Sequence, residues 1–213
     1  MNHLKRIPYG KSDFESINAQ GRYYVDKTTF IPHLEEVDFN FFLRPRRFGK
    51  SLLLSTLQSY YDVLMKDRFS ELYKNTWILE NPTAERAKYM ILYFNFSAVE
   101  KSKDRVQASF EGHCSREIDR FVRRYAEHLP SEAVSVVKSW TKPHDKLDAL
   151  WSALDRPEFP IYVMIDEYDN FTNTIISEYG SKDYQNLTHG SGAFRDFFSM
   201  LKAGTSGSGS PVA

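Results

Sequence analysis

Three adjacent residues, Gly49, Lys50 and Ser51, have the types and the spacing of a phosphate-binding turn. They follow an apolar run, Phe39–Leu43, which predicts a buried strand, and a short basic stretch. They precede apolar residues at helical spacing, namely Leu53, Leu57, Tyr60, Tyr61 and Leu64. A strand, a tight turn and a helix N-terminus bring the first free amide groups of the helix and the positive end of its dipole to one place. We therefore expect an anion to bind there.

Each residue of this turn has a separate expected role. Gly49 lets the backbone approach a phosphate without a Cβ atom in the way. Lys50 would reach the β and γ phosphates of a nucleotide, and the Ser51 hydroxyl would ligate the bridging Mg²⁺. The usual pattern opens with a glycine where this chain has Arg44. The alternative is a basic surface turn that joins a buried strand to a core helix.

A second apolar run, Ile161–Ile165, predicts a strand that ends in two acids, Asp166 and Glu167. In parallel α/β folds the carboxyl ends of neighbouring strands open onto one crevice, so we expect the acids to converge with the loop. Asp166 would hold Mg²⁺, directly or through water, and Glu167 would orient or deprotonate the attacking water. The alternative is a solvated strand end without a catalytic role.

Four segments together resemble the AAA-ATPase-like family over nearly the whole chain: IPYGKSDFESI, RYYVDKTTFIPHLEE, FLRPRRFGKSLLLSTLQSYYD and VMIDEYDNF. The resemblance implies a three-layer α/β/α P-loop NTPase fold with a mainly parallel sheet, and ATP and Mg²⁺ as its ligands. In that family the loop lacks its first glycine as a rule, as it does here. Lys50 and Glu167 match catalytic positions, and Ser51 and Asp166 match metal-binding positions. The expected nucleotide-binding loop comprises Arg46, Arg47, Phe48, Gly49, Lys50, Ser51 and Leu52.

The resemblance also places Tyr24, Val25, Asp26 or Thr28 near the adenine base. The alternative for this segment is an ordinary N-terminal helix from Lys27 to Glu36 that packs on the sheet, with Asp26 as its cap.

The expected organisation has an N-terminal segment at residues 1–38 packed on the core, a P-loop core at 39–203, and a flexible Gly/Ser tail or truncation point at 204–213. Between the two motifs, the apolar run at 89–97 predicts another strand, with Asn95 and Ser97 at its carboxyl end. These two residues either face the crevice or simply end the strand. Apolar residues at intervals of three and four predict a long amphipathic helix over 103–129.

The C-terminal end is expected to lack part of the sheet. Chains that resemble this one continue past Gly204 and Thr205 into a further core strand, whereas this chain turns to Ser and Gly. A core without that strand exposes a sheet edge, so self-association through the edge is an expected hazard.

Composition limits the classes of partner. The 213 residues include 28 basic and 28 acidic ones, so no net field attracts nucleic acid or a membrane. The basic cluster of Arg44, Arg46, Arg47 and Lys50 is more simply assigned to nucleotide phosphates. One cysteine, Cys114, excludes an intramolecular disulfide. No apolar run reaches the length of a membrane span, so we expect a cytoplasmic protein.

These features predict an ATPase in which water attacks the γ-phosphate of bound ATP. The alternative is a nucleotide-sensing switch or interaction module that binds ATP or ADP with little or no turnover. The resemblance further implies a downstream nuclease-like domain in the intact protein, which such a switch would regulate.

Overall fold

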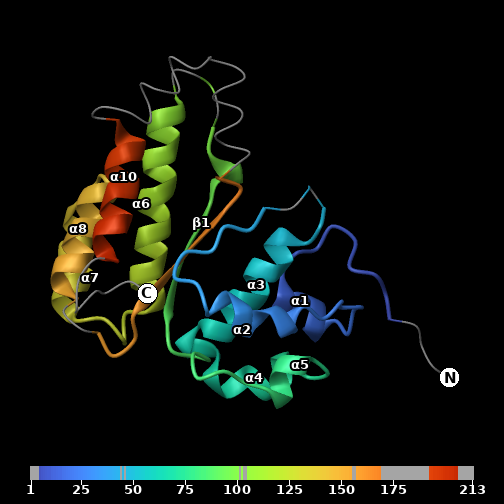
Figure 1. Ribbon diagram of the computed structural model, residues 1–213. Coiled ribbons are helices and arrows are strands. Elements are labelled where there is room, and N and C mark those ends of the chain that lie inside the picture. The colour runs from blue at the N-terminus through green and yellow to red at the C-terminus, as the bar shows by residue number, and fades with distance from the viewer. Residues whose placement is uncertain are drawn as a thin grey trace. The chain divides into compact units, whose positions relative to one another are not determined.

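The computed structural model describes residues 5–43, 45, 47–100, 102, 105–154, 157–168 and 192–205. The chain divides into two compact units, an N-terminal unit, Met1–Met90, and a C-terminal unit, Ile91–Ala213 (Figure 1). Each unit is described by itself.

Among the described residues of the N-terminal unit, the regular secondary structure consists of helices, apart from Met90, which begins the first strand. Its elements are α1 (Phe14–Ala19), the 3-10 helix η1 (Thr28–Phe30), α2 (Ile31–Leu34), α3 (Lys50–Tyr61), the 3-10 helix η2 (Val63–Arg68), α4 (Phe69–Leu72) and α5 (Trp77–Glu80). Helix α1 packs on α3 and α4. An aromatic cluster lies where these helices meet, with the ring of Tyr73 4.9 Å from that of Phe14 and 5.7 Å from that of Tyr60. All three residues are almost completely buried.

Two side chains, one just before η1 and one at its first residue, attach this part of the chain to the start of α5. The Asp26 carboxylate accepts hydrogen bonds from the Thr28 amide at 2.8 Å and from the Trp77 amide at 2.7 Å. The hydroxyl of Thr28 accepts one from the Ile78 amide at 3.1 Å, and Thr28 is fully buried. Because a helix start leaves its first amides without partners inside the helix, these oxygens satisfy groups that would otherwise be unpaired.

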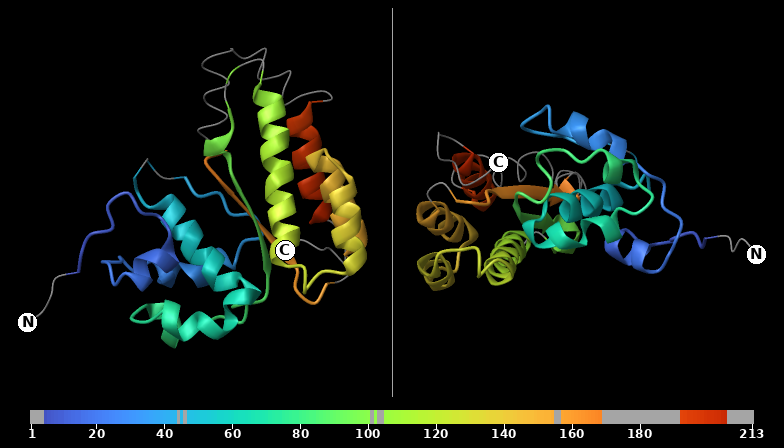
Figure 2. Two further views of the ribbon diagram at one scale, coloured as in Figure 1. Left: turned by 180° about the vertical axis from the view of Figure 1, so that it is seen from behind. Right: turned by 90° about the horizontal axis from the view of Figure 1, so that it is seen from below.

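The C-terminal unit combines helices with a small sheet. Its elements are β1 (Met90–Asn95), the 3-10 helix η3 (Phe96–Ala98), α6 (Val106–Arg124), α7 (Ser131–Ser139), α8 (Pro143–Ala153), β2 (Ile161–Asp166) and α10 (Ala193–Gly204). Strands β1 and β2 are hydrogen-bonded neighbours and run parallel. Helix α6 packs against α7, α8 and α10, and it runs beside α10 in Figure 1 and in the left view of Figure 2.

Phenylalanine rings fill the core of this unit. The fully buried Phe110 of α6 stacks on Phe194 of α10, with ring centroids 4.0 Å apart. Phe197 meets the same ring edge-on at 5.3 Å, and it also meets Phe94 of β1 edge-on at 5.2 Å. One aromatic cluster therefore joins two helices to the first strand.

Several expectations are confirmed. The helix after the Gly-Lys-Ser turn spans Lys50–Tyr61, the two apolar runs form β1 and β2, and the long amphipathic helix is present as Val106–Arg124. The mixture of helices with a parallel sheet is an α/β arrangement in the coarse sense. The helix expected from Lys27 to Glu36 is shorter and is divided into η1 and α2. Among the described helices, none has the length and apolarity needed to cross a membrane.

The strand predicted at Phe39–Leu43 is wrong. These residues have no regular secondary structure, and Phe41 and Leu43 are 87% and 83% exposed. A strand is stabilised by hydrogen bonds to a neighbouring strand. The described residues of the N-terminal unit provide no strand to pair with this run. The isolated parallel bridge described in this unit joins Asp62 to Tyr89 and does not involve the run. Apolar character alone therefore does not make this run a strand.

The core of the C-terminal unit yields a stability prediction. Replacement of Phe110 by alanine removes a fully buried ring and leaves a cavity, which we expect to cost about 3–5 kcal/mol of unfolding free energy. Urea unfolding followed by far-UV circular dichroism measures this loss. The control, Val136→Ala, truncates a side chain that is 42% exposed on α7 and should change stability by about 0.5 kcal/mol or less. Equal losses in both variants would contradict the packing described.

Burial of His113 predicts a pH dependence. Burial lowers the pKa of His113, and this effect is larger than the increase that the Glu117 carboxylate causes. The nearby Arg116 and Arg120 lower the pKa further. The unfolded chain then binds a proton more readily than the folded chain, so the His113 contribution to stability is full above the unfolded pKa and falls as pH decreases below it. Unfolding free energy should decrease between about pH 6.5 and pH 5. His113→Leu should reduce that slope, and an unchanged slope would show that His113 does not cause it.

Candidate functional site

The loop before α3 has an unusual backbone. Arg47 and Gly49 adopt positive φ angles of 69° and 78°, whereas Phe48 between them does not. When successive residues alternate between left-handed and right-handed backbone conformations, their N–H groups can point toward one concave side. Such concave turns are known anion-binding arrangements. Helix α3 begins at the next residue and is 12 residues long, so the positive end of its dipole faces the same region.

The side chains expected to bind nucleotide lie on this loop and on the first turn of α3. Arg47 and Phe48 are exposed, and Gly49, Lys50, Ser51 and Leu52 are half-buried. The Leu52 carbonyl accepts a hydrogen bond from the Thr56 hydroxyl at 2.9 Å. Arg46, like Arg44, lies outside the described residues. Six consecutive residues, from 47 to 52, thus occupy one short loop and helix start.

A lysine from elsewhere in the chain also reaches this loop. The Lys27 ammonium donates a hydrogen bond to the Phe48 carbonyl at 3.3 Å. It lies 3.4 Å from the position that a Cβ atom on Gly49 would occupy. Sequence reasoning missed this residue, because Lys27 lies 21 residues before Phe48 and no local pattern relates the two positions. Its neighbours Asp26 and Thr28, which the resemblance placed near adenine, use their side-chain oxygens to hold α5.

The acidic pair lies at the carboxyl end of β2. Asp166 is only 3% exposed. One of its carboxylate oxygens accepts a hydrogen bond from the Tyr93 hydroxyl at 3.2 Å, and the other accepts one from the Glu167 amide at 2.9 Å. The Tyr93 oxygen in turn accepts a hydrogen bond from the Asn95 amide group at 3.3 Å. Strands β1 and β2 therefore place polar side chains together where both strands end.

The electrostatics of this cluster keep Tyr93 protonated. Burial raises the pKa of the Tyr93 hydroxyl well above its ordinary value, and the neighbouring Asp166 carboxylate raises it further. Tyr93 consequently remains a hydrogen-bond donor to Asp166 throughout the physiological pH range. Sequence reasoning singled out Asn95 but missed Tyr93. The signal was present, because residues two apart on a strand point to the same face.

Glu167 has a strained backbone. Its φ angle of 60° lies in the left-handed region, which residues with a side chain rarely adopt. Such conformations cost about 1–3 kcal/mol and persist where the surroundings impose them, often at functional sites. In this conformation the Glu167 amide donates its hydrogen bond to the Asp166 carboxylate.

The residues present suit Mg²⁺ chemically. Within the part of the chain that the structure describes, no three His, Cys, Asp or Glu side chains gather into a metal-binding group. Mg²⁺ usually binds one or two carboxylates together with substrate phosphates and waters, so such a group is not required. The Asp166 carboxylate and the Ser51 hydroxyl, each taken within its own unit, are oxygen donors of the type that Mg²⁺ binds. A carboxylate has about four lone-pair positions, and Tyr93 and Glu167 occupy two of those on Asp166.

The two halves of the expected site lie in different units. Gly49, Lys50 and Ser51 belong to the N-terminal unit, and Asp166 and Glu167 belong to the C-terminal unit. The structure brings Lys27 to the loop and Tyr93 to Asp166. The convergence of Lys50 with Asp166 stays a prediction.

Comparisons with known proteins agree with the motifs. The family described as "Predicted AAA-ATPase" matches residues 8–208, which is most of the chain. A 59-residue stretch is 48% identical to an "Uncharacterized protein in vnfD 5'region" of Azotobacter chroococcum mcd 1. That match covers 27% of this chain and 11% of the relative, so the chain spans a small part of the length of that protein. No solved structure matches the chain.

The loop conformation gives a prediction for Gly49. An alanine there would have to adopt the positive φ angle, so we expect Gly49→Ala to lower unfolding free energy by about 1–2 kcal/mol. Gly112→Ala is the matched control, because this glycine lies inside α6 and its added Cβ would meet only the flexible end of Arg116, at 3.2 Å. Alanine favours a helix interior, so Gly112→Ala should cause no loss. Urea unfolding of both variants checks the contrast, and an unaffected Gly49→Ala would reject the loop conformation.

Proposed function

Because this chain belongs to the AAA-ATPase-like family of predicted AAA-ATPases, we propose that it binds ATP with Mg²⁺ and hydrolyses the bond to the γ-phosphate. The observation that carries the proposal is the alternating backbone of Arg47, Phe48 and Gly49 directly before α3. This conformation supplies amide donors to a phosphate at the residues that the family motif occupies.

In this proposal the loop binds the phosphates. The amides after Gly49 donate to phosphate oxygens, and the Lys50 ammonium neutralises charge on the β and γ phosphates. Ser51 and Asp166 would hold Mg²⁺, which would offset the negative charge that develops between the phosphates. Arg46 and Arg47 are further candidates for phosphate contact.

Hydrolysis requires an oriented water molecule. The Glu167 carboxylate would accept a hydrogen bond from that water and take its proton as the oxygen attacks the γ-phosphorus. The new bond joins the water oxygen to phosphorus, and the bond from the γ-phosphorus to the bridging oxygen breaks, which yields ADP and phosphate. The Tyr93 hydroxyl fixes the orientation of the neighbouring Asp166 through their hydrogen bond.

The proposed ATPase activity also depends on the fold of the whole chain. It requires a three-layer P-loop arrangement of which β1 and β2 form part, and it requires Lys50 and Asp166 to converge on one bound nucleotide. The resemblance also implies a nuclease-like domain as a partner, whereas the expected cytoplasmic location rests on the lack of a membrane-span run in the sequence, and the expected self-association rests on an exposed sheet edge.

Two substitutions separate binding from turnover. Saturating Mg-ATP, at about a hundred times its dissociation constant, should stabilise the protein by about 2.7 kcal/mol, measured as a thermal shift. Lys50→Ala should remove that shift. Glu167→Gln should keep the shift and lower phosphate release by about 10²–10⁴-fold, because the amide cannot accept the proton.

A control variant and two contrary results complete the test. Glu132→Gln changes an exposed glutamate in the first turn of α7 and should preserve both the shift and the rate. Equal phosphate release by the unaltered protein, Lys50→Ala and Glu167→Gln would reject the catalytic assignment. A thermal shift that depends on Lys50 without any phosphate release would favour the nucleotide-sensing switch.

A further inference from the structure

We propose that Lys27 is a second phosphate-binding lysine, which the segment before η1 contributes to the loop at Arg47–Gly49. The inference rests on the proposed nucleotide site and adds to it a cation that lies outside the loop motif. Its expected ligand is the phosphate chain of the nucleotide.

Geometry is the first argument. The Lys27 ammonium lies 3.3 Å from the Phe48 carbonyl oxygen and in ordinary contact, 3.4 Å, with the place of a Cβ atom on Gly49. These two loop residues directly precede the first amides of α3. The ammonium is therefore beside the stretch of backbone whose N–H groups are arranged for an anion.

The second argument is that the backbone around Lys27 is held in place. Asp26 and Thr28, on either side of it, bind the amides of Trp77 and Ile78 at 2.7 Å and 3.1 Å. Thr28 is fully buried. Lysine on a mobile surface segment loses much conformational entropy when it binds a ligand, whereas here the anchored backbone and the Phe48 contact have already reduced that cost.

The third argument is the unused donor capacity of the ammonium. It has three N–H donors, and the Phe48 carbonyl accepts one. Among the described residues, no carboxylate forms an ion pair with Lys27. A bound phosphate chain would supply acceptors for the remaining donors and a counter-charge for the ammonium. A polyanion thus accounts for the placement of this charge better than the carbonyl contact alone.

The test measures nucleotide binding by the full chain. Titration calorimetry with Mg-ATP, and separately with inorganic triphosphate, compares the unaltered protein with Lys27→Met, Lys27→Arg and Lys50→Ala. Methionine keeps the aliphatic length of the side chain and removes its charge. A lost charge-assisted hydrogen bond predicts about 10- to 100-fold weaker binding of both ligands by Lys27→Met. Lys27→Arg should bind within about threefold of the unaltered protein, because it restores a cation.

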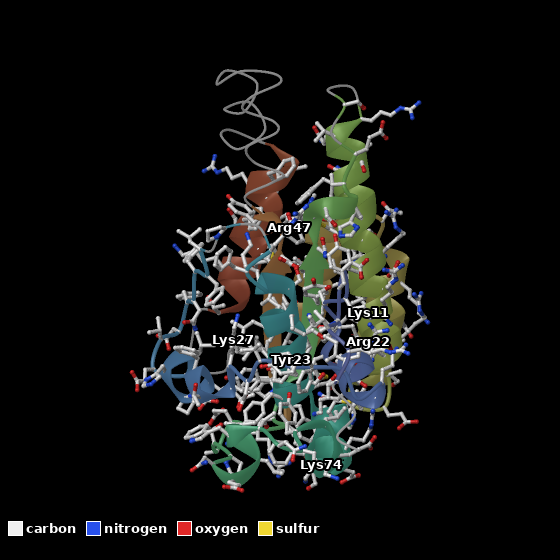
Figure 3. The ribbon with its side chains drawn as sticks, turned by 90° about the vertical axis from the view of Figure 1, so that its right-hand side faces the viewer. Lys11, Arg22, Tyr23, Lys27, Arg47 and Lys74 are labelled. Atoms are coloured by element: carbon white, nitrogen blue, oxygen red, sulfur yellow. The ribbon has the colours of Figure 1, made fainter. Side chains whose placement is uncertain are left out.

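Lys74→Ala is the matched control. Lys74 is an exposed lysine of the same unit, and Figure 3 shows it well away from Arg47, toward the opposite end of the unit. It should leave binding unchanged. The melting temperature of Lys27→Met without ligand should equal that of the unaltered protein, and this readout would fall if Lys27 served only to hold the Phe48 carbonyl.

The outcomes distinguish the two levels of the argument. Loss of binding in Lys50→Ala with full binding in Lys27→Met would overturn the role of Lys27 and leave the nucleotide site standing. Equal weakening in Lys27→Met and Lys27→Arg, with a lower melting temperature in both, would assign Lys27 to structure instead. Nucleotide binding that is absent in the unaltered protein, or unaffected by Lys50→Ala, would reject the site itself.

Discussion

The left-handed backbone at Gly49 is the constraint on which the candidate site depends. It ends the loop, begins α3 and, with Arg47, turns the intervening amides toward one side. Glycine adopts this conformation without the steric cost that a Cβ atom brings. The helix behind the loop is in turn held by the buried aromatic residues Tyr60 and Phe14, so the packing of the unit supports the geometry of the loop. Fold and site are therefore coupled through one short segment.

The carboxyl end of β2 shows a second constraint, which is the need to satisfy a buried charge. Burial of Asp166 is costly unless its oxygens accept hydrogen bonds. Tyr93 and the Glu167 amide provide them, and the high pKa of Tyr93 makes it a dependable donor. These hydrogen bonds fix the orientation of the Asp166 carboxylate. The same cluster also defines the strained position of Glu167.

Local patterns predicted much of the secondary structure. The start of α3, both strands of the sheet and the long helix α6 follow from residue types and spacing within short windows. The same reasoning was wrong at Phe39–Leu43, where the pattern measured apolar character but not the availability of a pairing strand. A strand forms only when a second segment is available to pair with it, and the pattern within one segment does not reveal whether that partner exists.

The sequence by itself determined the family motifs, the helix start at Lys50 and the acidic end of β2, because each depends on residues that are neighbours in the chain. Only the tertiary structure decided that Lys27 reaches the Phe48 carbonyl and that Tyr93 binds Asp166. Both contacts join residues that are far apart in sequence. Their distances are set by the packing of whole units, which no local spacing encodes.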